Sequence, residues 1–236
     1  MNEQNARRLP WRRIAAEGSA IVVSILLAFA IQAWWERRNL DEAYQLQLRS
    51  TLAELQEAQA TLDSWSTQRR RTESNVTHLA EQLDSLPVGS PIGVGDTVVA
   101  SLVSYVVMEL PTAQVDALLS FDYPALATSS LRRKLMALRA MIDDQHDDEV
   151  ILREFILREM GPYLRENFDV AAAQRAWFDW LVRGEAPIGQ TKLASTLQLR
   201  NLIAWRQRDI YLLLAQDDAL AEALAQVSDE IRLTLD

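Results

Sequence analysis

Residues 18–35, GSAIVVSILLAFAIQAWW, decide how the rest of this chain is organised. The stretch contains no charged residue and no proline, and eight of its residues are Ile, Val, Leu or Phe. A helix rises about 1.5 Å per residue, so it would extend for roughly 27 Å here, close to the ~30 Å hydrocarbon core of a bilayer. Residues 18–35 are therefore predicted to form a transmembrane helix after a basic N-terminal tail, residues 1–17.

Tryptophans stand at both ends of this stretch: Trp11 before it, and Trp34 and Trp35 at its end. Tryptophan side chains favour the membrane–water interface, so these three residues are predicted to contact lipid head groups. The short basic tail before the stretch and the large acidic region after it favour a cytoplasmic N-terminus and an extracytoplasmic C-terminal domain.

Two other interpretations of the same stretch remain open. A buried helix of a soluble protein seldom contains so long a run without a charge. A cleaved signal peptide would have a basic start, an apolar middle and a small-x-small site, for which Ala28-Phe29-Ala30 qualifies. The apolar run continues past Ala30 to Trp35 without a helix breaker, which favours a retained anchor.

Small residues recur every four positions along the predicted anchor. This spacing lets two membrane helices approach closely, and a glutamine on the same face would hydrogen-bond across the pair. The hypothesis is a homodimer face, although alanine is also common in membrane helices that do not pair. The row comprises Ala16, Ala20, Ser24, Ala28 and Gln32.

The composition favours an all-helical domain after the anchor. The chain has 236 residues but only seven Gly and seven Pro, and no cysteine, which excludes disulfides and thiolate chemistry. The net charge of −9 argues against nucleic acid as a partner, because that function needs a basic surface. The local basic clusters at 69–71 and 132–134 are interpreted as solvated helix faces.

Helical periodicity extends through most of residues 36–236, which are predicted to form one helical-bundle domain. Residues 36–86 contain a heptad row of apolar residues that only Arg69 interrupts, and a bundle helix is preferred to an intermolecular coiled coil. The row is Leu48, Leu55, Leu62, Val76 and Leu83. Further long helices are predicted at about 129–160 and 190–236. The fold class is thus all-α: a transmembrane helix continuing into a long helix, followed by an antiparallel helical bundle.

Glycine and proline mark the expected breaks between these helices. Residues 87–96, with two Pro and three Gly, are predicted to be a loop. Residues 97–110 fit helical spacing better than strand alternation, despite their valines. Gly161-Pro162 is predicted to end the 129–160 helix.

Three stretches carry a family resemblance that covers nearly the whole chain. The run GSAIVVSILLAFAIQAWWERRNLDEAYQLQL (18–48), with MGPYL (160–164) and LRNLIAW (199–205), resembles a family of uncharacterised bacterial single-pass membrane proteins whose anchor ends in a Trp-Trp pair. The resemblance implies an all-helical extracytoplasmic domain at the bacterial inner membrane. It supplies no catalytic residues.

Two groups of residues come nearest to a ligand or metal site. Residues 143–149, DDQHDDE, offer carboxylates and an imidazole, with Asp143, Asp144, His146 and Asp147 as candidate metal ligands. Consecutive residues point in different directions around a helix, so a solvated acidic face is the preferred interpretation. Trp177, Phe178 and Trp180 would either pack the bundle or line an apolar ligand site.

These patterns predict a membrane-anchored, non-enzymatic module that acts as a scaffold or a sensor. No cofactor is expected, and its expected partners are the bilayer and an unidentified envelope protein. The alternatives are a metal-dependent hydrolase at 143–149 and a binder of an apolar ligand inside the bundle near Trp177 and Trp180. Metal-dependent stabilisation would favour the first alternative, and a lipid-dependent change in tryptophan fluorescence the second.

Overall fold

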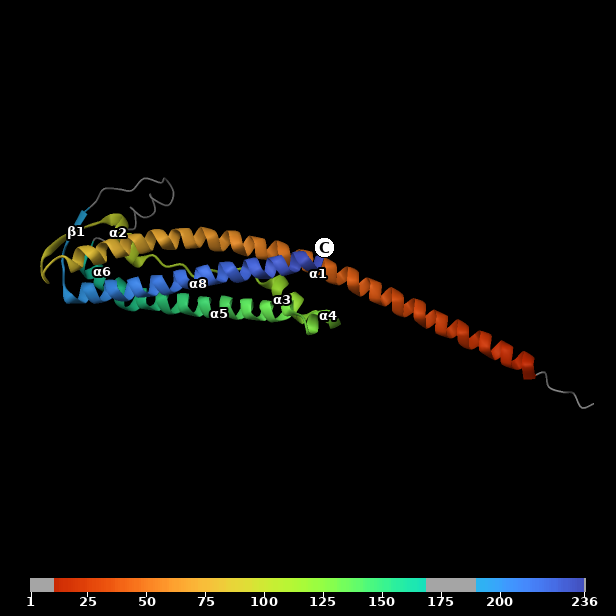
Figure 1. Cartoon of the computed structure of the whole chain (residues 1–236). Coiled ribbons are helices and arrows are strands. Elements are labelled where there is room, and N and C mark those ends of the chain that lie inside the picture. The colour runs from red at the N-terminus through yellow and green to blue at the C-terminus, as the bar shows by residue number, and fades with distance from the viewer. Residues whose placement is uncertain (1–10, 169–189, 236) are drawn as a thin grey trace, which may run out of the picture. The chain divides into compact units, whose positions relative to one another are not determined.

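The computed structural model describes residues 11–168 and 190–235, and most of them are helical. In chain order the elements are α1 (Trp11–Asp84), β1 (Pro91–Gly95), α2 (Asp96–Val103), α3 (Ala113–Ser120), α4 (Pro124–Ala127), α5 (Ser130–Phe155), the π-helical segment η1 (Ile156–Met160), α6 (Gly161–Asn167), β2 (Gln190–Ala194) and α8 (Leu197–Leu235) (Figure 1). This confirms the predicted all-α class.

The chain divides into two compact units, Met1–Gln47 and Leu48–Asp236. In the first unit, α1 leaves ten large apolar side chains between 50% and 65% exposed. They are Ile21, Val22, Val23, Ile25, Leu26, Leu27, Phe29, Ile31, Trp34 and Trp35. This part of α1 is long and apolar enough to cross a membrane. α1 begins at Trp11, so residues 11–17 of the predicted tail are helical.

The second unit contains three long helices: α1 from Leu48 onward, α5 and α8. α1 and α8 run in opposite directions. Ser66 donates to Asp217, whereas Arg200, which precedes Asp217 in α8, donates to the carbonyl of Leu86, which follows Ser66 in the chain. The same holds for α5 and α8, where Lys134 pairs with Glu230 and Asp148 accepts from Gln216. The bundle is therefore antiparallel, as predicted, and Figure 1 shows α5 and α8 side by side.

Heptad spacing explains why these helices pack along one stripe. Every apolar member of the predicted α1 row, from Leu48 to Leu83, is buried. In α8 two such rows are buried, and together they hold Leu199, Ile203, Arg206, Ile210, Leu213, Asp217, Leu220, Leu224, Val227 and Ile231. A repeat of seven keeps each stripe facing its neighbours over many turns.

The predicted loop at 87–96 is wrong in its second half. Residues 91–95 form β1, which pairs antiparallel with β2, from Pro91 opposite Ala194 to Gly95 opposite Gln190. The closing helix consequently begins at Leu197 rather than at residue 190. The partner strand lies about 100 residues away in the sequence, so local propensity could not reveal this pairing.

The helix predicted to stop at Gly161-Pro162 instead continues through it. The Gly161 N–H donates to the carbonyl of Ile156, five residues back, which closes a π-helical turn. A Cβ at residue 161 would lie 3.0 Å from that carbonyl oxygen, so only glycine fits without displacement. Pro162 then falls in the first turn of α6, where its missing N–H has little cost.

The helix predicted over 97–110 is shorter than expected. α2 ends at Val103, and the chain enters an extended conformation at Ser104. Residues 104–112 connect α2 to α3 without regular secondary structure. Side chains from the long helices bind this connection directly.

Candidate functional site: a buried charge layer

Polar side chains interrupt the apolar stripe of all three long helices at one level of the bundle. They are Arg69 in α1, Gln145 and Glu149 in α5, and Asp217 in α8, and we call these four residues the charge layer. Each occupies a core position of its helix, because the residues seven positions before and after it are apolar and, apart from the half-buried Ile142, buried. Ionised groups in a core need close partners.

Arg69 supplies the partner for both acids. Its Nη1 donates to Asp217 Oδ1 and its Nη2 donates to Glu149 Oε1. The Arg69 side chain is 9% exposed, and both carboxylate side chains are fully buried. One guanidinium therefore joins α1 to α5 and to α8 with charge-assisted bonds.

The remaining carboxylate oxygens also accept hydrogen bonds. Glu149 Oε2 accepts from the backbone N–H of Met108 at 2.5 Å, which holds the 104–112 connection against α5. Asp217 accepts from Ser66 Oγ at 3.0 Å and from Gln145 Nε2 at 2.5 Å. Every carboxylate oxygen of the two acids thus accepts at least one hydrogen bond from within the protein.

Burial dominates the titration of these acids. Desolvation raises the pKa of Glu149, while the Met108 N–H and Arg69 oppose the shift. Desolvation likewise raises the pKa of Asp217 against the effects of Arg69, Ser66 and Gln145. Either acid therefore takes up a proton at a higher pH in the folded state than in the unfolded chain.

Arg206 lies in α8 beside this layer and is only 2% exposed. Its Nη2 donates to the carbonyls of Ser104 and Ser101, the latter at 3.4 Å, so it fixes the end of α2. Together with Glu149, Arg206 binds the backbone of the 104–112 connection from the interior of the bundle.

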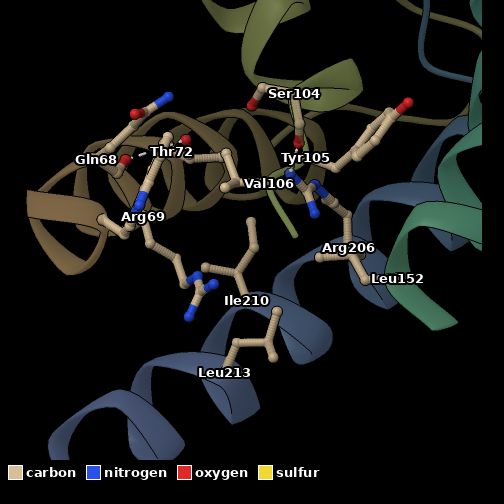
Figure 2. A pocket seen from close by; sticks show the side chains of 11 residues that line it. Gln68, Arg69, Thr72, Ser104, Tyr105, Val106, Leu152, Arg206, Ile210 and Leu213 are labelled. Carbon is tan, nitrogen blue, oxygen red and sulfur yellow. Dashed lines mark hydrogen bonds between the residues drawn. The ribbon is translucent and has the colours of Figure 1, made fainter. Parts of the chain in front are cut away.

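A cavity of about 40 Å³ adjoins Arg206 and Arg69 and is partly open to solvent. Figure 2 shows both arginines around it, Arg69 from α1 and Arg206 from α8. Trp65, Gln68 and Thr72 of α1, Ser104–Val106 of the connection, Leu152 of α5, and Ile210 and Leu213 of α8 complete its lining.

The interpretation of 69–71 as a solvated face is wrong for Arg69. Its neighbours Arg70 and Arg71 are exposed as expected, and Arg70 pairs with Asp218 while both side chains are more than half exposed. In the second basic cluster, Arg132 donates to the carbonyl of Leu119, and Lys134 pairs with Glu230. These side chains link helices rather than only facing solvent.

The acidic run 143–149 spreads around α5 as expected. Asp143 pairs with Arg139, Asp144, His146 and Asp147 are exposed, and Glu149 belongs to the charge layer. Within residues 11–168 and 190–235, no three His, Asp or Glu side chains come together as a metal site. The candidate ligands therefore do not converge.

The predicted interface tryptophans and the residues of the possible dimer face all lie in α1. Trp34 and Trp35 lie together with ring centroids 6.2 Å apart, and Trp11 begins α1. All five small or polar row residues belong to α1; Ser24 donates to the Ala20 carbonyl and Gln32 to Glu36, so both bond within their own helix. Trp177, Phe178 and Trp180 lie outside the described residues.

Sequence reasoning missed Glu149, Arg206 and Asp217 as core residues. The signal was present in the spacing, since Arg206 and Asp217 fall within the buried heptad rows of α8 just as Arg69 interrupts the row of α1. A charge inside a row indicates a buried partner on another helix.

None of the protein-family models, curated proteins or solved structures compared with this chain matches it. The resemblance to the single-pass family consequently stays a prediction. The class of protein defined by the fold is an all-helical protein with one N-terminal helix apolar enough to span a membrane.

Proposed function

We propose that this chain is a single-pass protein of the bacterial inner membrane, with a cytoplasmic N-terminus and a non-enzymatic extracytoplasmic helical module. The supporting observation is the contrast between the two units. The first exposes ten large apolar side chains on an uncharged stretch, whereas the second buries a continuous core. Such an exposed apolar surface is rarely left in water.

The role proposed for the module is that of a scaffold or a sensor for another envelope protein. The charge layer favours this role over catalysis, because each of its carboxylates is held by donors inside the protein. Buried groups bonded in this way fix the register of helices. Such a layer suits a rigid module that presents its outer surface to a partner.

Fusions at Asp236 test the topology. A reporter that is active only after export should be active there, and a fluorescent reporter that matures only in the cytoplasm should be dark. The opposite pair of results would contradict the proposed orientation. Retention of the intact N-terminus in the membrane fraction separates an anchor from a cleaved signal peptide.

Charge substitutions test the anchor itself. Each arginine at the centre of a membrane helix costs about 2.5–3.5 kcal/mol, so Leu26→Arg/Leu27→Arg should outweigh the roughly 4 kcal/mol contributed by the apolar residues. The variant should leave the membrane fraction. Leu46→Arg is the matched control, since Leu46 is an exposed leucine of α1 outside the apolar stretch, and this variant should remain membrane-bound.

A further inference from the structure

The cavity beside Arg206 is lined by two cations and, among the described residues, by no acid. Its arginines differ in their pairing. Arg69 pairs with both Glu149 and Asp217, and each of the four oxygens of these acids accepts a hydrogen bond from a group other than Arg206. The residues that line the cavity thus carry two positive charges and no negative one, since the two acids bonded to Arg69 are not part of the lining.

Arg206 has three nitrogens but uses only one of them within the part of the chain that the structure describes. Nη2 donates to backbone carbonyls, while Nε and Nη1 are buried without a hydrogen-bond partner. The carboxylate that most favours its charge, Asp209, is bonded to Arg208. Two unpaired donors on a buried cation require an explanation, such as a bound ion or water.

The cost of this arrangement appears in the titration of Arg206. Burial lowers its pKa to about 9, with Arg69 acting in the same direction and Asp209 against it. A water molecule would satisfy the hydrogen bonds of the guanidinium but not its charge. An anion that accepts from the unpaired Nη1 would provide both a hydrogen bond and a compensating charge.

We infer that this cavity binds a small monovalent anion, most suitably a short aliphatic carboxylate, through Arg206. About 40 Å³ accommodates roughly three water molecules or an anion of the size of formate or acetate, and excludes nucleotides and sugars. Val106, Leu152 and Ile210 supply an apolar wall for the hydrocarbon end. Nε and Nη1 are shielded from solvent, so binding requires a small movement of Arg206 or of residues 104–106.

This inference goes beyond the proposed function and does not depend on it, since every lining residue belongs to the second unit. It assigns the 104–112 connection to the site, because Arg206 holds Ser104 and Tyr105 lines the cavity. An anion there would bridge α8 to the connection and stabilise the fold according to its concentration.

The test uses the full chain in detergent, titrated with sodium acetate, formate or chloride. Sodium gluconate at equal ionic strength is the control, because gluconate is too large for the cavity. Thermal stability should rise with acetate above the gluconate baseline, and saturation-transfer NMR on the acetate methyl group should report binding. Arg206→Met should weaken acetate binding at least tenfold, whereas Arg208→Met, at an exposed arginine of the same helix, should not change it.

A second variant keeps the test decisive if Arg206→Met does not fold. Val106→Met fills the cavity while leaving both arginines in place, and it should also weaken acetate binding at least tenfold. Equal binding by wild type and by the folded variants would overturn the inference. The absence of any response to all three anions in wild type would overturn it as well, and would leave the cavity to water alone.

Discussion

Arg69 joins the three long helices in the interior of the bundle. A buried cation between two buried carboxylates is tolerated because each group is bonded to the others, and the removal of one partner leaves the rest uncompensated. A register of the three helices that separated Arg69 from either acid would leave a buried charge unpaired and would therefore cost free energy. This holds even where the net contribution of the layer to stability is small.

Arg69→Met should lower the free energy of unfolding by about 3–5 kcal/mol, because Glu149 and Asp217 would remain buried without a cation. Urea unfolding of the full chain in detergent, followed by helical circular dichroism, measures this loss. Arg70→Met is the control, since its pair with Asp218 is exposed, and it should cost less than about 0.5 kcal/mol. Equal losses in the two variants would contradict the charge layer.

Replacing the three charged residues of the layer separates specificity from stability. Arg69→Leu/Glu149→Leu/Asp217→Leu leaves no charge unpaired, so its unfolding free energy should recover most of the loss seen in Arg69→Met. The same urea titration measures the recovery. A triple variant less stable than Arg69→Met would show that the ionic contacts themselves are strongly stabilising.

The charge layer also predicts the sign of a pH effect. Burial raises the pKa of Glu149 and Asp217 above their ordinary values of 4.5 and 3.8. A raised pKa means that the folded state binds the proton more tightly than the unfolded chain does. The resulting contribution to the free energy of unfolding is complete at pH values below the ordinary pKa and is lost as the pH rises through the raised pKa. Relative to Glu149→Gln/Asp217→Asn, wild type should gain unfolding free energy as pH falls from 7 toward the ordinary values. A loss over the same interval would contradict the assignment.

At the scale of elements, the short helix α3 depends on a side chain from another helix. Glu54 of α1 accepts from the backbone N–H groups of Gln114 at 2.9 Å and Val115 at 3.0 Å, while Thr112 at the N-cap provides no side-chain bond. The first amides of a helix have no intrahelical acceptor. Glu54 therefore caps α3 from outside.

Glu54→Ala should release this cap and speed hydrogen exchange at the Gln114 and Val115 amides. A lost cap costs about 0.5–2 kcal/mol, which corresponds to roughly a 2- to 30-fold increase in exchange rate if opening is local. Glu57→Ala, at an exposed position one turn further along α1, is the control and should leave both amides unchanged. Equal acceleration in both variants would mean that α1 itself had been destabilised.

The elements divide clearly into those that the sequence predicts and those that it does not. The heptad row from Leu48 to Leu83 identified α1 because helical periodicity is local. β1 was missed because its pairing partner β2 is distant in the sequence. Pro162 does not end the helix, because a π-helical turn precedes it. Helix propensity scales do not describe such turns.

The candidate site shows the same division. Arg69 was visible as a break in an apolar row, but its acids were assigned to a solvated face or not noted, because charges are usually exposed. Only the packing of three helices reveals that Glu149 and Asp217 meet Arg69. The cavity beside Arg206 depends additionally on the 104–112 connection, whose path follows from bonds made by distant residues.

At the scale of the whole molecule, the second unit has a core that does not need the apolar part of α1. The core extends from Val76 and Leu83 of α1 through Met160 to Leu199 and Ile210 of α8, all of which are buried. The exposed apolar residues of the first unit contribute nothing to this cluster. The units should therefore be separable.

A protein lacking residues 1–35 should be soluble and strongly helical and should unfold in one cooperative transition, as measured by circular dichroism and calorimetry. Removing residues 191–236 instead should abolish the fold, because α8 contributes ten core positions across two heptad rows.

Leu213→Ala, at a residue 3% exposed, should cost about 2–5 kcal/mol of unfolding free energy. Leu212→Ala, at the adjacent residue 51% exposed, should cost less than about 0.5 kcal/mol. If the chain without α8 stays folded, or if the two leucine variants unfold alike, α8 is not part of the core and would be a free arm.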